Sequence, residues 1–111
     1  MNDLTVFKNK QFGEVRTVEI SGEPWFVGKD VATCLAYKDT SDALKKHVDD
    51  EDKGVGVLPT PGGRQQVIII NESGLYSLIL GSKLPTAKQF KRWTSLSQQK
   101  KRGLHNEQRQ N

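Results

Sequence analysis

Cysteine is nearly absent from this sequence: Cys34 is the single cysteine among 111 residues, so no disulfide can form within the chain. No apolar run approaches the roughly 20 residues that a membrane-spanning helix requires. The N-terminus also lacks the charged segment and apolar core of a secretory signal. These three absences predict a protein of the reducing cytoplasm with no membrane partner.

Catalytic and metal-binding patterns are equally sparse. Cys34 and His47 have the chemistry of a nucleophile and its base, but Cys34 lies on or beside an apolar stripe, where a buried and inert thiol is expected. His47 precedes the acidic run Asp49–Asp52, yet a zinc site needs a second histidine or a cysteine pair at set spacing, and only His105 remains. A calcium loop needs oxygen ligands that alternate around a glycine. The sequence therefore predicts no enzyme activity, metal or cofactor.

The formal net charge of +4 is distributed unevenly along the chain. Residues 82–111 contain eight basic residues and one acidic residue, whereas residues 1–58 contain eight basic and eleven acidic ones. Electrostatic attraction falls off within a Debye length of about 8–10 Å in physiological salt, so the C-terminal charge cannot serve a distant face. The C-terminal part favours contact with a polyanion, and the slightly acidic first half suits a basic protein partner.

Alternation of apolar and polar residues predicts an N-terminal β-meander and, later, a β-hairpin. The meander strands are expected at residues 4–8, 14–20 and 25–27, with turns between them. The hairpin strands are expected at residues 55–58 and 66–70. The segment that joins them, PTPGGRQ, is longer than a two-residue turn, so we expect a projecting, wing-like loop.

Helical periodicity follows the meander and also ends the chain. A short helix is expected to begin near Gly28, and Ser41 is the expected N-cap of a second helix. Asn71 is expected to cap a third helix that Gly81 ends in the left-handed conformation, and Pro85 begins a fourth. These elements predict a small single-domain α+β fold with an N-terminal β-meander, a central helix pair, a β-hairpin with a wing-like loop and two C-terminal helices.

Two segments are candidates for contact with nucleic acid. A helix pair with a tight hinge is the geometry that places one helix in the DNA major groove, and Lys45 and Lys46 face outward on its second helix. Arg64 in the wing-like loop can form a bidentate pair with phosphate or with a guanine edge. The alternative is that the helices only close a core, with solvated charges outside, and that the loop is an ordinary surface turn.

The last predicted helix has one cationic side and one aromatic side. Lys88, Lys91 and Arg92 can attract phosphate, or they form the solvated face of an amphipathic helix. Phe90 and Trp93 are assigned to the core rather than to base stacking, because they recur at helical spacing. Residues 1–95 are expected to form the domain, and residues 96–111 a frayed basic tail.

Four stretches carry a family resemblance: WFVGKDVATCLAY, SDALKKHVDDEDKGV, TPGG and IINESGLYSLILGSKLPTAKQFKRW. In order and spacing they resemble the BRO-type N-terminal domain of prophage antirepressors and of BRO proteins from large DNA viruses. The resemblance implies a DNA-binding module of a phage or prophage regulatory protein that acts in a bacterial or infected host cell. By position it offers the following DNA-facing candidates: Lys29, Lys38, Lys45, Lys46, Arg64, Lys83, Lys88, Lys91 and Arg92.

This sequence departs from the family pattern at the hinge, which reads LAY where LGY is usual. Ala36 is therefore expected to cost about 1 kcal/mol of left-handed strain. The expected partner is DNA, in double-stranded form, and self-association is compatible with the pattern. A second hypothesis is a protein-interaction module that sequesters a repressor or a host factor, which the acidic balance of residues 1–58 favours.

Overall fold

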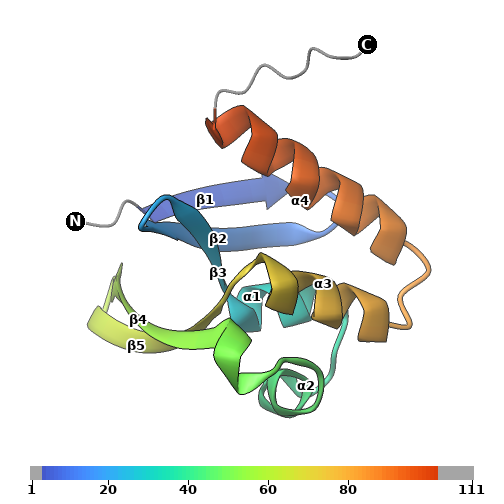
Figure 1. Ribbon diagram of the computed structural model, residues 1–111, viewed down its shortest axis with the longest axis horizontal. Helices are drawn as coiled ribbons and strands as arrows, with labels where there is room; N and C mark the ends of the chain where they lie inside the picture. The colour runs from blue at the N-terminus through green and yellow to red at the C-terminus, as the bar shows by residue number, and fades with distance from the viewer. Residues whose placement is uncertain (1–3, 103–111) are drawn as a thin grey trace.

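The computed structural model of the protein describes the backbone of residues 4–102 and the side chains of residues 4–95. The described chain forms one five-stranded antiparallel sheet with four α-helices, which confirms the predicted small α+β fold (Figure 1). Strands β1 (Leu4–Asn9), β2 (Gly13–Ile20) and β3 (Glu23–Val27) form the predicted meander. Strands β4 (Lys53–Thr60) and β5 (Gly63–Ile70) complete the sheet in the order β1-β2-β3-β5-β4.

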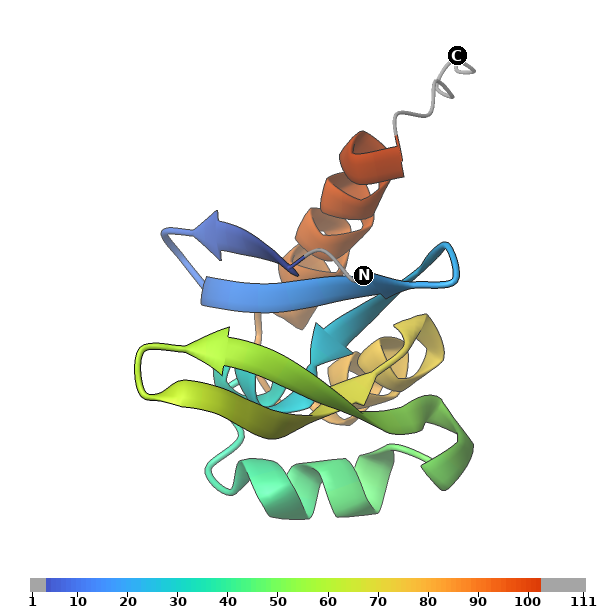
Figure 2. The same cartoon turned by 90° about the vertical axis from the view of Figure 1, so that its left-hand side faces the viewer.

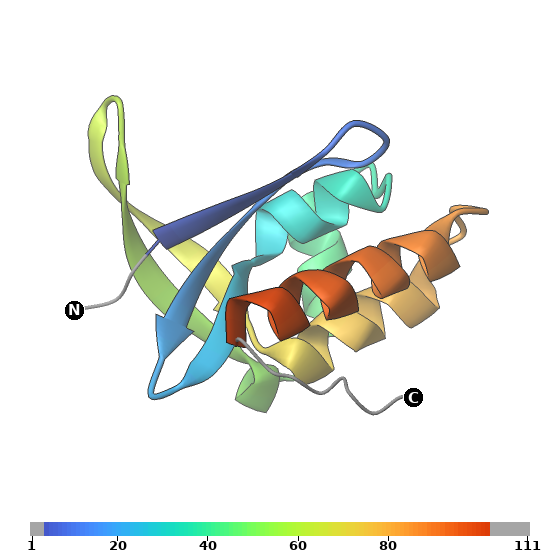
Figure 3. The ribbon, with the colours of Figure 1, turned by 90° about the horizontal axis from the view of Figure 1, so that it is seen from above.

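The β4–β5 hairpin is longer than its apolar pattern suggested. Cα pairing continues to Thr60 and Gly63, so only Pro61 and Gly62 lie between the strands. The expectation of a long loop between residues 58 and 66 was therefore wrong. Backbone hydrogen bonds do not require apolar side chains, and Gly63 reaches a φ of +113° that suits a tight turn. The tip of the hairpin projects away from the helices (Figures 1 and 3).

Five helical segments connect and follow the strands. Helix α1 leaves β3 directly, α2 and a short 3₁₀ segment precede β4, and α3 and α4 follow β5. Seen from the side, α1, α3 and α4 lie behind the sheet, and α2 runs along its lower edge (Figure 2). Their bounds are α1 Gly28–Cys34, α2 Thr40–His47, η1 Asp50–Asp52, α3 Glu72–Gly81 and α4 Ala87–Arg102.

Helix ends show which sequence signals were reliable. Asn71 caps α3 as predicted, since its side chain accepts a hydrogen bond from the Gly74 amide at 2.9 Å. The N-cap of α2 is Asp39 rather than Ser41, because the Asp39 carboxylate accepts from the Asp42 amide at 3.0 Å. Gly81 does not end α3 in the left-handed conformation. The chain instead becomes extended at Ser82, with φ −79° and ψ 140°.

The hinge after α1 has the strain expected at Ala36, whose φ is +67°. The Tyr37 amide donates to the Ala32 carbonyl and the Ala36 amide donates to the Thr33 carbonyl, each at 3.0 Å. These two bonds form a Schellman motif, which normally places glycine at the left-handed position. The chain adopts this turn despite the Cβ of Ala36 because the turn satisfies two helix carbonyls.

An ion pair attaches the start of α1 to the meander. The Asp30 carboxylate accepts from Arg16 Nε at 2.8 Å, from Arg16 Nη2 at 2.9 Å and from the Arg16 amide at 3.0 Å. This hydrogen-bonded carboxylate raises the pKa of the Arg16 guanidinium. Charge-assisted bidentate pairs of this kind fix geometry as well as energy, so the orientation of α1 on β2 is well defined.

The main core joins buried residues of β2, β3 and β5 to buried residues of helices α1, α2, α3 and α4. Phe90 is fully buried and Trp93 packs against it at 5.4 Å between ring centroids, which confirms their assignment to the core. Cys34 is buried as expected, and desolvation, with the nearby charge of Asp30, raises its pKa to about 11. A smaller apolar cluster joins four strands of the sheet through Val18, Val27, Leu58 and Ile69.

Helix α4 continues past the domain boundary proposed at residue 95 and ends at Arg102. The remainder of the predicted tail, residues 103–111, lies outside the described residues. Within the part of the chain that is described, no helix is long and apolar enough to cross a membrane.

Candidate nucleic-acid interface

Helix α2 presents its cations to solvent, as its pattern predicted. Ala43 and Leu44 are buried, whereas Lys45 and Lys46 are exposed on the other side. Lys46 forms an ion pair with Asp42 at 3.2 Å, one helical turn earlier. Lys45 has no ion-pair partner among the described side chains. Exposed pairs contribute little energy, so both lysines remain available to phosphate.

A hollow of about 510 Å³ opens beside the end of α2. Its walls come from three segments that are distant in the sequence: the hinge after α1, the last residue of α2, and the connection between α3 and α4. We call it the cationic hollow, and its lining residues are Leu35, Ala36, Tyr37, Lys38, His47, Gly81, Lys83, Leu84 and Pro85.

One wall of the cationic hollow is formed by two aromatic rings. The Tyr37 and His47 rings contact each other, with centroids 5.5 Å apart. The Tyr37 hydroxyl donates to the Leu78 carbonyl at 2.8 Å, and burial raises the pKa of this hydroxyl. Gly81 packs so closely behind them that a Cβ there would lie 2.7 Å from the His47 ring. The rings are therefore held in place from two sides.

The opposite wall is tied to the hinge by one serine. Ser82 Oγ donates to the Leu35 carbonyl at 3.1 Å and accepts from the Leu84 amide at 3.1 Å. These bonds join the connection between α3 and α4 to the end of α1. The shape of the cationic hollow is therefore set by tertiary hydrogen bonds between segments that the sequence places far apart.

The charge of the cationic hollow is positive. Lys38 and Lys83 are exposed, and neither forms an ion pair with a described side chain. No aspartate or glutamate is among the described residues that line it. Two ammonium groups at a hollow that no described carboxylate lines attract an anion, and phosphate is the anion that nucleic acids offer.

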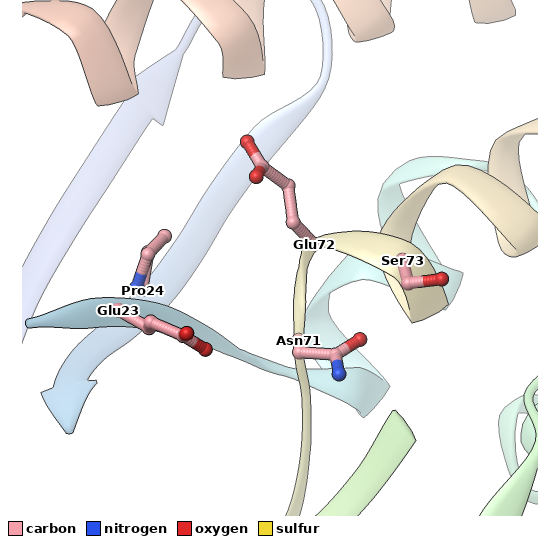
Figure 4. Close-up of a pocket in the computed structure, with 5 residues that line it drawn as sticks. All are labelled: Glu23, Pro24, Asn71, Glu72 and Ser73. Atoms are coloured by element: carbon pink, nitrogen blue, oxygen red, sulfur yellow. The ribbon is translucent and has the colours of Figure 1, made fainter. Parts of the chain in front are cut away.

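A second hollow, of about 300 Å³, has the opposite character (Figure 4). Glu23, Pro24, Asn71, Glu72 and Ser73 line it, where the start of α3 meets β3. We call it the acidic hollow. Asn71 is already committed there, because its Nδ2 donates to Asp52 Oδ1 at 3.1 Å while its Oδ1 caps α3. Two carboxylates make this hollow unsuitable for phosphate.

The remaining predicted cations are exposed but spread over the surface. Lys29 lies on α1, and Arg64 lies on β5 next to the projecting turn. Lys88, Lys91 and Arg92 lie on the exposed side of α4, where Lys91 sits 5.5 Å from the centroid of the Tyr76 ring. None of these five residues lines the cationic hollow. The structure therefore brings together Lys38 and Lys83 from the predicted set.

Sequence reasoning did not identify the other walls of the cationic hollow. Tyr37 was given no role, and Gly81 was assigned to the end of a helix. His47 was considered as a base and as a metal ligand, and in the structure it is half-buried against Tyr37. One sequence signal could have pointed to these residues. Tyr37 in LAY, His47 in HV and Gly81 in GSKLP each lie in one of the stretches that carry the family resemblance. Their proximity follows only from the tertiary fold.

Comparison with known proteins agrees with the motifs. The model of the BRO family, N-terminal domain, matches residues 14–99. Two putative Bro-N domain-containing proteins of Invertebrate iridescent virus 6, 289L and 201R, are 38% and 35% identical over 107 residues. Those alignments cover 80% and 78% of this chain but 26% of each viral protein. No solved structure matches.

A bacterial relative extends the comparison. An uncharacterized protein of Haemophilus influenzae is 38% identical over 72 residues, which cover 65% of this chain and 36% of that protein. The chain thus spans about a quarter to a third of the length of these relatives. The family match extends from β2 into α4 and includes every segment that lines the cationic hollow. The chain belongs to the BRO family, through its N-terminal domain.

Proposed function

We propose that this domain is the DNA-binding module of a phage or prophage antirepressor-like regulator, and that it acts in the cytoplasm of a bacterial or infected host cell. Lys38 and Lys83 at the cationic hollow, with Lys45 and Lys46 on α2, meet the phosphates of a duplex. Lys29, Arg64 and the α4 cations extend this contact. The module has a binding role without enzyme activity.

One observation carries the proposal: two lysines from distant segments border a single hollow that no described carboxylate lines. The described part of the chain contains nine lysine and arginine residues before Lys83, and several of them are neutralised by ion pairs. Lys8, Arg16 and Lys53 each have a carboxylate partner within 4.0 Å. The cations that stay unpaired include those at the hollow, which is the arrangement that a polyanion recognises.

Fluorescence anisotropy with a labelled duplex over a salt series tests the proposal. Affinity should fall linearly on logarithmic axes as salt rises, because each contacted phosphate releases counterions. The variants Lys38→Gln, Lys45→Gln and Lys83→Gln should each reduce the slope by about one.

The matched control is Ser21→Asp, which makes the same change in net charge. Ser21 is exposed in the β2–β3 turn at φ +53°, a conformation that aspartate tolerates. This variant should bind like the wild type. The proposal fails if the duplex is not bound at low salt, or if the control loses as much affinity as the lysine variants.

A second candidate function rests on the acidic side of the molecule. Asp49, Asp50 and Glu51 are exposed around η1, and the acidic hollow adds Glu23 and Glu72. These carboxylates suit a basic protein such as a repressor or a host factor. Capture from host lysate on the immobilised domain, with nuclease added, separates the candidates. A partner that is retained after nuclease and lost in Asp50→Lys supports this second function.

A further inference from the structure

We propose that the cationic hollow binds a single nucleotide unit, meaning a phosphate with its sugar and base. The unit is either a free mononucleotide or an unpaired nucleotide of a DNA strand. The inference deepens the proposed function and rests on it in one respect, since Lys38 and Lys83 are taken to meet phosphate in both. It adds that the hollow accepts the rest of the nucleotide as well.

The size of the cationic hollow suits a small organic ligand. The volume of about 510 Å³ falls within the roughly 300–1,000 Å³ that is usual for small-molecule sites. A phosphate in contact with two lysines on the rim would leave most of this space empty. A ligand that fills the hollow must therefore carry a larger organic group attached to the anion.

The lining of the cationic hollow combines apolar, aromatic and cationic groups. Leu84 and Pro85 provide apolar contact, and the Tyr37 and His47 rings provide aromatic contact. A nucleobase is a planar group that gains energy from both kinds of surface. Lys38 and Lys83 supply positive charge at the same hollow, so an uncharged apolar ligand would leave them unused. A nucleotide satisfies both requirements.

The walls of the cationic hollow are preorganised. Three contacts hold the walls before any ligand binds. They are the hydrogen bond from the Tyr37 hydroxyl to the Leu78 carbonyl, the hydrogen bond from Ser82 Oγ to the Leu35 carbonyl, and the close contact of Gly81 with His47. Ala36, which lines the cationic hollow, has its backbone in the left-handed region at φ +67°. A site whose walls are already ordered loses little conformational entropy on binding, which is the usual condition for specific recognition of a small ligand.

An NMR titration of the ¹⁵N-labelled protein with thymidine monophosphate tests the inference. The nucleotide should shift the amides of residues 35–38 and 81–84. Thymidine and inorganic phosphate, at matched ionic strength, should each bind at least about tenfold more weakly, because each offers one of the two required groups. Lys38→Gln and Lys83→Gln should each weaken the nucleotide about fivefold, whereas Ser21→Asp should leave it unchanged.

A second pair of titrations identifies the source of the nucleotide. The domain is titrated with a fully paired duplex and with the same duplex carrying one unpaired thymine. If the duplex with the unpaired thymine binds more tightly, and thymidine monophosphate competes away this extra affinity, the hollow binds an unpaired nucleotide of a DNA strand. Equal binding of the two duplexes, with the mononucleotide still bound, assigns it to a free nucleotide.

Two outcomes overturn the inference. The first is that the mononucleotide shifts no amide around the hollow, and the second is that inorganic phosphate binds as tightly as the mononucleotide. In either case, salt-dependent binding of the paired duplex would leave the proposed DNA-binding function intact. Conversely, nucleotide binding without duplex binding would remove that function and keep the hollow as a nucleotide site.

Discussion

The acidic hollow and the cationic hollow are built from similar parts and differ in what their polar groups do. Each lies where the end or start of a helix meets another segment, and each is bordered by charged side chains. In the acidic hollow, the Asn71 side chain already makes hydrogen bonds within the protein, because it caps α3 and donates to Asp52. In the cationic hollow, Lys38 and Lys83 have no ion-pair partner among the described side chains.

This difference separates stability from recognition. A polar group that is already hydrogen-bonded in the fold stabilises the domain, and its loss is felt in the free energy of unfolding. An exposed charge without a partner contributes little to stability, so its loss is felt mainly when a ligand is added. Substitution of Asn71 at the acidic hollow should therefore change stability, and substitutions of the lysines at the cationic hollow should change binding.

The largest expected effect is on DNA affinity. Lys38→Glu combined with Lys83→Glu should weaken duplex binding about a hundredfold at low salt, because two attractive contacts become repulsive. Glu23→Gln combined with Glu72→Gln should leave affinity unchanged or slightly raise it. Anisotropy measures both, and equal losses in the two double variants would abolish the distinction between the hollows.

The next largest effect is on stability at the acidic hollow. Asn71→Ala should lower the free energy of unfolding by about 2 kcal/mol, because it removes the N-cap and the bond to Asp52. Ser73→Ala, at an exposed neighbour in the same hollow, should stay within about 0.5 kcal/mol of the wild type. Urea denaturation measures both. A neutral Asn71→Ala would show that the cap is dispensable.

Gly81→Ala tests whether the cationic hollow also has a structural wall. Overpacking against His47 and Tyr37 should cost ~1–3 kcal/mol, and the better helix propensity of alanine offsets up to about 1 kcal/mol of this. A net loss of about 1–2 kcal/mol is expected in urea denaturation. Gly62→Ala is the control, since a Cβ there meets nothing within 4 Å. Similar results for the two variants would mean that the His47 ring moves freely.

The smallest effect is a gain. Ala36→Gly should raise the free energy of unfolding by up to about 1 kcal/mol, because it removes left-handed strain at φ +67° and gives back part of the gain through a more flexible unfolded chain. Thermal unfolding measures it. Duplex affinity should not fall, because the lysines remain. A lower melting temperature would mean that the Ala36 methyl group makes a contact that outweighs the strain.

Local signals predicted most elements of the fold. Alternation located the meander, and helical periodicity located four helices together with the buried position of Phe90. Errors occurred where two local signals competed. Asp39 and Ser41 are both good N-caps, and only the conformation of the hinge selects Asp39. The extent of the β4–β5 hairpin depends on backbone pairing, which leaves no trace in side-chain polarity.

The candidate site was predictable residue by residue but not as a site. Lys38 and Lys83 were each identified by the family resemblance, yet nothing in the sequence indicates that they border the same hollow. Tyr37 and Gly81 lie in stretches that carry the family resemblance, but neither was a candidate for binding. Their roles come from a close contact between α2 and the end of α3, which is a packing relation and has no sequence periodicity.

The sequence by itself determined the chemical inventory of this protein: an α+β pattern, the BRO-type motifs, one cysteine and the cations available to an anion. It did so because polarity, periodicity and turn residues act over a few neighbouring positions. The tertiary structure alone decided that Lys38 and Lys83 line the same hollow, and that the Tyr37 and His47 rings line it with them. That decision belongs to packing, since the hinge, the end of α2 and the α3–α4 connection meet only when the core between them is closed.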